Sequence, residues 1–81
     1  MVESMLNLYL MMVEIKETVL EDGTVRKEIP TEYRCDYCNG VINKVEYYNQ
    51  YKHKMFHRWT CGSCQRDFGY DTEEPLRYNR L

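Results

Sequence analysis

The chain has 81 residues, of which 11 are basic and 13 acidic, and it contains four cysteines. This length accommodates one small domain and excludes the enzymes that are built on large α/β scaffolds. A chain of this size buries only about 60–65% of its unfolded surface, so such domains commonly need a disulfide, a metal ion or a partner for stability. The net charge of −2 provides no overall attraction to nucleic acid or to an anionic membrane.

No stretch of the sequence reaches the ~18 consecutive apolar residues of a membrane span. The longest apolar run, residues 8–13, follows Glu3 instead of a basic stretch, and charged residues follow it instead of a cleavage site. We therefore expect an intracellular, cytoplasmic protein without membrane contact. Most thiols stay reduced in that compartment, so paired cysteines favour metal binding over disulfides.

Charge divides the chain into three parts. Residues 1–32 form an acidic segment with three cations and seven acids, residues 33–71 contain the four cysteines and an excess of cations, and residues 72–81 form a tail. The pattern of residues 1–12 does not decide between a helix and a strand, because only some of their apolar side chains fit one helical face. For the tail, a disordered end is favoured over an extended partner contact.

Residues 13–29 are predicted to form a β-hairpin. A three-residue loop of Glu21, Asp22 and Gly23, with Gly23 in the left-handed conformation, sets the alignment of the two strands. In this register the cross-strand pairs are Val19 with Val25, Ile15 with Ile29, Glu17 with Lys27 and Lys16 with Glu28. Opposite charges and β-branched partners thus agree on one alignment. Pro30 is expected to end the hairpin.

The cysteines form two chelating pairs with 22 residues between them, namely Cys35 and Cys38, then Cys61 and Cys64. Two intervening residues let each pair wrap a tight turn around a metal ion and supply half of a tetrahedron. Asn39 and Gly40 follow the first pair as such a turn requires, with Gly40 free to adopt a positive φ. Because Gln65 and Arg66 follow the second pair, its turn is expected to be less regular.

Alternating residues between the cysteine pairs predict two strands joined by a polar turn at residues 49–53. The alternating positions are Val41, Val45, Tyr47 and Tyr51, followed by Met55, His57 and Trp59. A third strand is expected after the second pair, with one face formed by Arg66, Phe68 and Tyr70. The fold class predicted is small all-β, with an N-terminal β-hairpin followed by a three-stranded antiparallel ribbon.

The segment Cys35-Asp36-Tyr37-Cys38-Asn39-Gly40 and residues 59–68 around the second pair resemble the zinc-ribbon family, over about residues 33–71. The resemblance implies two cysteine turns that cap a three-stranded antiparallel sheet. It also implies a role in transcription, because zinc ribbons recur in RNA polymerase subunits and elongation factors. Transcript-cleavage factors of that family carry an adjacent Asp-Glu pair at the hairpin tip. The tip here is Asn49-Gln50-Tyr51-Lys52, which argues against cleavage stimulation.

One structural Zn²⁺ is the expected cofactor, and four thiolates leave it no position for a catalytic water. We therefore expect no enzymatic activity and no small-molecule substrate. A rubredoxin-like Fe(Cys)₄ electron carrier stays open, although it would want a glycine at Gln65. A disulfide or a redox-active Cys-Gly-Ser-Cys also stays open, although a thioredoxin-like site would want a βαβ frame. His53 and His57 lie about 13 Å apart on one strand, as ordinary surface residues.

Cations alternate with aromatic residues in residues 52–59, a composition typical of a face that binds single-stranded nucleic acid. In the alternative, Phe56 or Trp59 packs in the core and the cations are solvated. The eight tyrosines favour a protein interface. The leading prediction is an adaptor that binds a larger protein partner, with direct binding of single-stranded DNA or RNA as the alternative. The candidate binding residues are Tyr48, Tyr51, Lys52, Lys54, Phe56, Arg58, Trp59 and Arg66.

Overall fold

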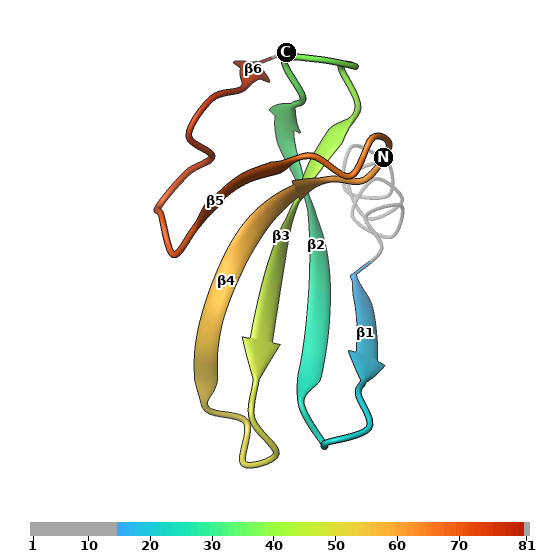
Figure 1. Ribbon diagram of the computed structural model, residues 1–81, viewed down its shortest axis with the longest axis vertical. Helices are drawn as coiled ribbons and strands as arrows, with labels where there is room; N and C mark the ends of the chain where they lie inside the picture. Colours follow the sequence, from blue (N-terminus) through green and yellow to red (C-terminus); the bar gives the residue numbers. More distant parts are fainter. Residues whose placement is uncertain (1–14, 81) are drawn as a thin grey trace, which may run out of the picture.

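The structure, a computed structural model, describes residues 15–80, which form one antiparallel sheet with the strand order β1-β2-β3-β4-β5 (Figure 1). The strands are β1 (Lys16–Val19), β2 (Val25–Arg34), β3 (Val41–Tyr48), β4 (Lys54–Cys61), β5 (Asp67–Tyr70) and β6 (Asn79–Arg80). The short β6 pairs with β2. The all-β prediction is confirmed, and the question of helix or strand for residues 1–12 lies outside the described residues. Within residues 15–80, no helix has the length and apolar character needed to cross a membrane.

The N-terminal hairpin has the predicted register. Lys16 pairs with Glu28, Glu17 with Lys27 and Val19 with Val25. Gly23 takes a φ of 89°, and Leu20 closes the three-residue loop by donating to the Thr24 carbonyl at 2.8 Å. The predicted pairing of Ile15 with Ile29 is absent from the described strands, because β1 begins at Lys16.

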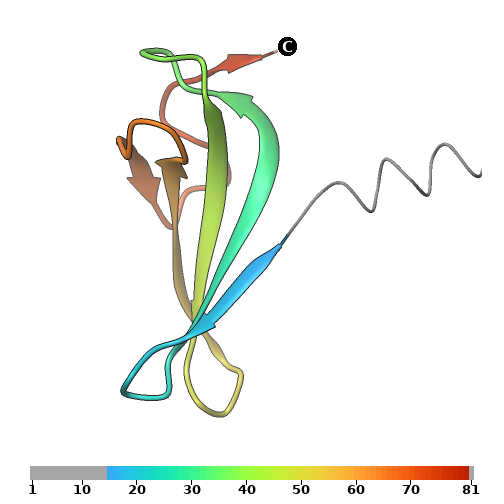
Figure 2. The ribbon, with the colours of Figure 1, turned by 90° about the vertical axis from the view of Figure 1, so that its right-hand side faces the viewer.

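Strand β2 continues through Pro30 to Arg34, so the expectation that Pro30 ends the hairpin is wrong. The pairing with β3 is instead irregular between Pro30 and Arg34, as expected next to a residue that lacks a backbone N–H. Thr31 compensates in part, because its hydroxyl donates to the Ile42 carbonyl. One long strand therefore connects the hairpin directly to the first cysteine pair. In the side view of Figure 2, β1 leaves the direction of its neighbours, as in a strongly twisted sheet.

Side chains alternate between two faces of the sheet, which we name by their most characteristic residues. The arginine face carries Arg26, Glu28, Val45 and Arg58. The tryptophan face carries Ile42, Lys44, Glu46 and Trp59. Strand β3 has buried side chains on both faces, since Ile42 and Val45 are both inaccessible to solvent. The predicted alternation of Val41, Val45 and Tyr47 therefore missed Ile42, which belongs to the main core.

The main core lies on the tryptophan face, next to the cysteines. It consists of Cys35, Ile42, Trp59, Cys61 and Phe68, with Tyr33, Cys64 and Tyr78 packed against it. The predicted third strand is present as β5, but Phe68 is buried whereas Tyr70 is 56% exposed. Gly69 between them has a φ of 117°, which interrupts the regular alternation of a strand.

Residues 71–80 form a strap that covers this core, so the favoured expectation of a disordered tail is wrong. The Thr72 carbonyl accepts hydrogen bonds from Trp59 Nε1 at 3.0 Å and from His57 Nε2 at 2.7 Å. Leu76 N donates to the Phe68 carbonyl at 2.8 Å, and the rings of Tyr78 and Tyr33 lie 4.4 Å apart. The strap ends in β6 at the edge of β2, where it closes the core.

Candidate metal centre

Four cysteine sulfurs meet between the ends of β2, β3, β4 and β5. The Sγ atoms of Cys35, Cys38, Cys61 and Cys64 all lie within 4.8 Å of one another. Cys38 and Cys61 sulfurs are 3.4 Å apart, and those of Cys35 and Cys64 are 3.7 Å apart. Metal–sulfur bonds of 2.3 Å in a tetrahedron place neighbouring sulfurs about 3.8 Å apart. All four cysteines are free, and this donor set suits a metal ion that prefers thiolates.

Each cysteine pair lies in a tight turn, which we call the first knuckle (residues 35–40) and the second knuckle (residues 61–66). Cys35 N donates to the Gly40 carbonyl at 2.8 Å, and Cys61 N donates to the Arg66 carbonyl at 2.9 Å. Asn39 and Gln65 occupy the same place in the two turns, with φ values of 62° and 67°. The expectation of a less regular second knuckle is therefore wrong.

Gly40 is not at the left-handed position of its turn, which corrects the role that its sequence position indicated. Asn39 takes the positive φ instead, and asparagine tolerates this conformation better than most residues. Gly40 is needed for space: a Cβ at this position would lie 2.6 Å from Ser63 Oγ and 3.1 Å from Cys61 Sγ. The two knuckles thus approach each other too closely for a larger residue.

We expect Gly40→Ala to weaken metal binding, because the added methyl group would push the second knuckle away from the first. Removing the opposing side chain with Ser63→Gly should restore part of the affinity in the double variant. Competition with a chromophoric chelator measures both effects. Equal metal affinities for Gly40→Ala and the parent protein would contradict the steric role.

Backbone N–H groups surround the sulfurs. Tyr37 N and Cys38 N donate to Cys35 Sγ, and Gly40 N donates to Cys38 Sγ, each at 3.4 Å. Ser63 N and Cys64 N donate to Cys61 Sγ at the same distance. Such donors stabilise thiolates and orient them toward a metal ion.

These contacts set different pKa values for the thiols. Burial raises the pKa of Cys61, but the N–H groups of Cys64 and Ser63 outweigh it and lower the pKa to about 7. The Gly40 N–H lowers the pKa of Cys38, but the proton shared with the Cys61 sulfur and burial raise it to about 12. Metal binding at neutral pH therefore has to displace at least the proton of Cys38.

Metal affinity should accordingly fall as the pH decreases. The lowered pKa of Cys61 provides a thiolate above about pH 7, and this thiolate is lost as the pH falls through that value. Each further proton that the metal must displace lowers the apparent binding constant about tenfold per pH unit. Chelator competition at pH 6, 7 and 8 measures the slope, and a pH-independent constant would contradict thiolate ligation.

Side chains outside the metal cluster hold the two knuckles together. The guanidinium of Arg66, in the second knuckle, stacks 3.8 Å from the ring centre of Tyr37, in the first. Arg77 of the strap forms an ion pair with Asp36 at 2.9 Å. The strap and both knuckles are thus connected at the surface as well as through the sulfurs.

The candidate binding residues do not form one surface: they lie in the core, on the arginine face, at the knuckles and at the far end of the sheet. Trp59 is 3% exposed and belongs to the core, and Phe56 stacks on Tyr47 at 4.5 Å on the arginine face. Arg58 also lies on the arginine face. Arg66 is placed at the knuckles, as described above.

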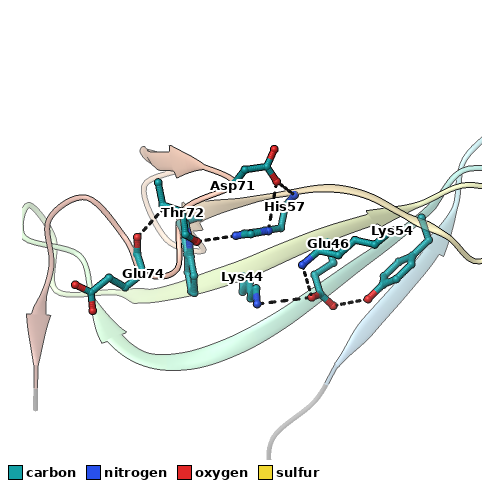
Figure 3. Close-up of polar contacts among 9 residues, drawn as sticks. Lys44, Glu46, Lys54, His57, Asp71, Thr72 and Glu74 are labelled. Carbon is teal, nitrogen blue, oxygen red and sulfur yellow. Dashed lines mark hydrogen bonds and ion pairs between the residues drawn. The ribbon is translucent and has the colours of Figure 1, made fainter.

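The remaining candidates lie toward the far end of the sheet from the knuckles. Tyr51 and Lys52 are exposed in the turn between β3 and β4. Tyr48 and Lys54 both contact Glu46 on the tryptophan face. Tyr48 Oη donates a hydrogen bond to the Glu46 carboxylate at 2.8 Å, and Lys54 Nζ forms an ion pair with it at 3.5 Å. Figure 3 shows Lys44 reaching the same carboxylate. Burial raises the pKa of Glu46, but the Tyr48 hydrogen bond and the two lysines lower it below its ordinary value.

His57 is the residue whose role sequence analysis missed. Its ring lies between the Thr72 carbonyl and Asp71, with Nδ1 3.4 Å from the Asp71 carboxylate (Figure 3). The backbone N of His57 also donates to this carboxylate at 3.0 Å. His57 therefore holds the start of the strap on β4, and no sequence signal connected it with residues 71 and 72.

No family model matches the chain, and neither a curated protein nor a solved structure matches it. The four-cysteine cluster is therefore the feature that bears most directly on function. It is a cluster of four sulfurs that could hold a metal ion in a small all-β domain.

Proposed function

We propose that this protein is a non-enzymatic adaptor of the zinc-ribbon type, in which one structural Zn²⁺ stabilises a sheet that binds a larger protein partner. The observation that carries the proposal is the closed set of four cysteine sulfurs. Four protein thiolates complete a tetrahedral zinc site, so the metal would support the fold and would leave no position for a substrate. Reduced thiols suit a protein of an intracellular compartment.

We favour zinc over iron because the proposed role of the site is structural and not electron transfer. Both metals, however, accept four thiolates. A rubredoxin-like iron site was expected to need a glycine at position 65. Gln65 adopts the positive φ that a glycine would supply, so its presence does not exclude iron. Metal analysis of the protein purified from its native cells decides between the two. Iron at one atom per chain, with reversible one-electron reduction, would replace the adaptor with an electron carrier.

The polar groups support a structural use over a catalytic one. His57 and Asp71, which as a pair resemble part of a catalytic site, hold the strap on β4. Glu46 is neutralised by two lysines. In the described part of the chain, these groups are engaged in hydrogen bonds and ion pairs that hold the fold, and we infer that the protein catalyses no reaction.

Protein binding has more support than binding of single-stranded nucleic acid. Tyr37, Tyr51, Met55 and Tyr70 are each more than half exposed, and large exposed side chains are common at protein interfaces. Bases cannot stack on Trp59, which is buried, and Lys54 is already paired with Glu46. A partner in transcription or another nucleic-acid machine is in keeping with the zinc-ribbon resemblance.

A pulldown from native lysate with the metal-loaded protein, with and without nuclease, tests this function. The adaptor proposal predicts one specific protein that is retained after nuclease treatment and is lost when the metal is removed. Capture that disappears with nuclease would move the function to nucleic acid. Capture that is unchanged after metal removal would contradict the need for the folded ribbon.

A further inference from the structure

A hollow of about 520 Å³ lies on the arginine face of the sheet, and no residue of the strap lines it. Three strands contribute long charged side chains to its wall. They are Lys16 from β1, Arg26 and Glu28 from β2, and Arg58 from β4, around the buried Val45 of β3. The hollow extends to the second knuckle through Gly62 and Gln65.

The charges in this hollow are only partly neutralised. Arg26 pairs with Glu28 and donates through Nε to the Tyr47 hydroxyl at 3.2 Å. Within residues 15–80, Lys16 and Arg58 form no ion pair. Arg58 Nε is buried and has no hydrogen-bond partner there. A buried donor without an acceptor is unfavourable, so a bound anionic group would satisfy it.

The register places the two free cations at a defined spacing. Lys16 pairs with Glu28, Glu28 with Val45, and Val45 with Arg58, so these residues form one row across four strands. With strands about 4.8 Å apart, the backbones of Lys16 and Arg58 are about 14 Å apart. Side chains four residues apart on an extended peptide lie on one side and about 13 Å apart. Two acidic side chains at that spacing therefore match the two cations.

The overall charge favours a peptide over nucleic acid as the occupant. The chain has a net charge of −2, and a Zn²⁺ with four thiolates adds a further charge of about −2. Lys44 and Lys54 are engaged by Glu46, and Arg66 by the ring of Tyr37. A nucleic acid backbone requires several cations along its path, whereas two carboxylates require two.

We propose that the hollow on the arginine face binds an extended acidic segment of the protein partner, with one carboxylate on Arg58 and a second on Lys16. This assignment rests on the proposed adaptor function and specifies the chemistry of its partner. Arg58 suits the buried end of the segment, because a guanidinium binds a carboxylate through two parallel hydrogen bonds.

A fluorescein-labelled extended peptide with glutamates at positions i and i+4 is the probe, and the same peptide with glutamines is its control. Fluorescence anisotropy with the metal-loaded full chain should detect binding of the glutamate peptide only. Arg58→Gln should weaken this binding at least about tenfold, and Lys16→Gln should weaken it about threefold. Lys54→Gln is the matched control, because it removes one charge from β4 on the opposite face and should change binding less than about twofold.

Metal content and amide NMR dispersion establish that each variant is folded. If Arg58→Gln unfolds, Lys16→Gln provides a second variant, because it alters an exposed side chain of β1. Equal binding of the glutamate and glutamine peptides would overturn the proposal. Equal losses for Arg58→Gln and Lys54→Gln would do the same, because they would indicate a non-specific charge effect.

A labelled single-stranded oligonucleotide is the competing occupant. If it binds in an Arg58-dependent manner and the glutamate peptide does not, the hollow is a nucleic-acid site and the proposal is wrong. The lysate pulldown separates this proposal from the adaptor function. Retention of the protein partner by Arg58→Gln would leave the adaptor function intact and would show that the partner binds elsewhere.

Discussion

Replacing Cys61 by serine is expected to unfold the protein under conditions in which the parent chain is folded. The four sulfurs lie at the junction of the strands, and Cys61 is fully buried beside Trp59 and Phe68. Structural zinc sites contribute an apparent ~10–16 kcal/mol at neutral pH. A chain of 81 residues has a total stability of only about 4–12 kcal/mol, so a structural zinc in this site would supply most of it.

Circular dichroism and amide NMR, with metal analysis of the same samples, measure this effect. Ser63→Ala is the matched control within the second knuckle, because its backbone N still donates to the Cys61 sulfur. This control should keep one metal ion and a dispersed spectrum. A Cys61→Ser protein that also kept both would show that the fold does not depend on four-sulfur ligation.

Truncating Trp59 to alanine is expected to be the most destabilising change outside the metal site. The indole is 3% exposed, packs edge-on against Tyr33 at 5.7 Å and donates to the Thr72 carbonyl. Removing a buried tryptophan typically costs about 3–5 kcal/mol. Detachment of the strap should add to this cost, since the Thr72 carbonyl would keep only its hydrogen bond from His57.

Urea denaturation of the metal-loaded proteins measures the loss as a lower transition midpoint. Tyr51→Ala is the control, because Tyr51 is 74% exposed and should change stability by less than about 0.5 kcal/mol. Trp59→Phe retains much of the packing and separates the lost hydrogen bond from the cavity. Equal midpoints for Trp59→Ala and Tyr51→Ala would contradict the placement of the indole in the core.

The sequence predicted those features that depend on local spacing. The register of the first hairpin followed from Gly23 and from the charge pairs of Lys16 and Glu17, which agree on one alignment. The cysteine spacing likewise predicted the cluster, because two intervening residues force both sulfurs of a pair to one side of a turn.

Features that depend on contacts between distant segments were not predictable in this way. Residues 71–80 carry no strong strand pattern, and they are ordered by the carbonyl of Thr72 and by the ring of Tyr78. The role of Gly40 was assigned to a positive φ, whereas the structure requires it for contact with Ser63, 23 positions later in the chain. Trp59 matched a nucleic-acid pattern by composition, but a small sheet needs its largest side chain for the core.

Titration of the reduced, metal-free protein with Zn²⁺, followed by amide NMR, tests the central claim most directly. If the four cysteines hold the metal that stabilises the sheet, the metal-free chain has poorly dispersed signals. A dispersed β-sheet spectrum then appears and saturates at one equivalent of Zn²⁺. A metal-free protein that already shows the dispersed spectrum, or one that Zn²⁺ leaves unchanged, would contradict the claim.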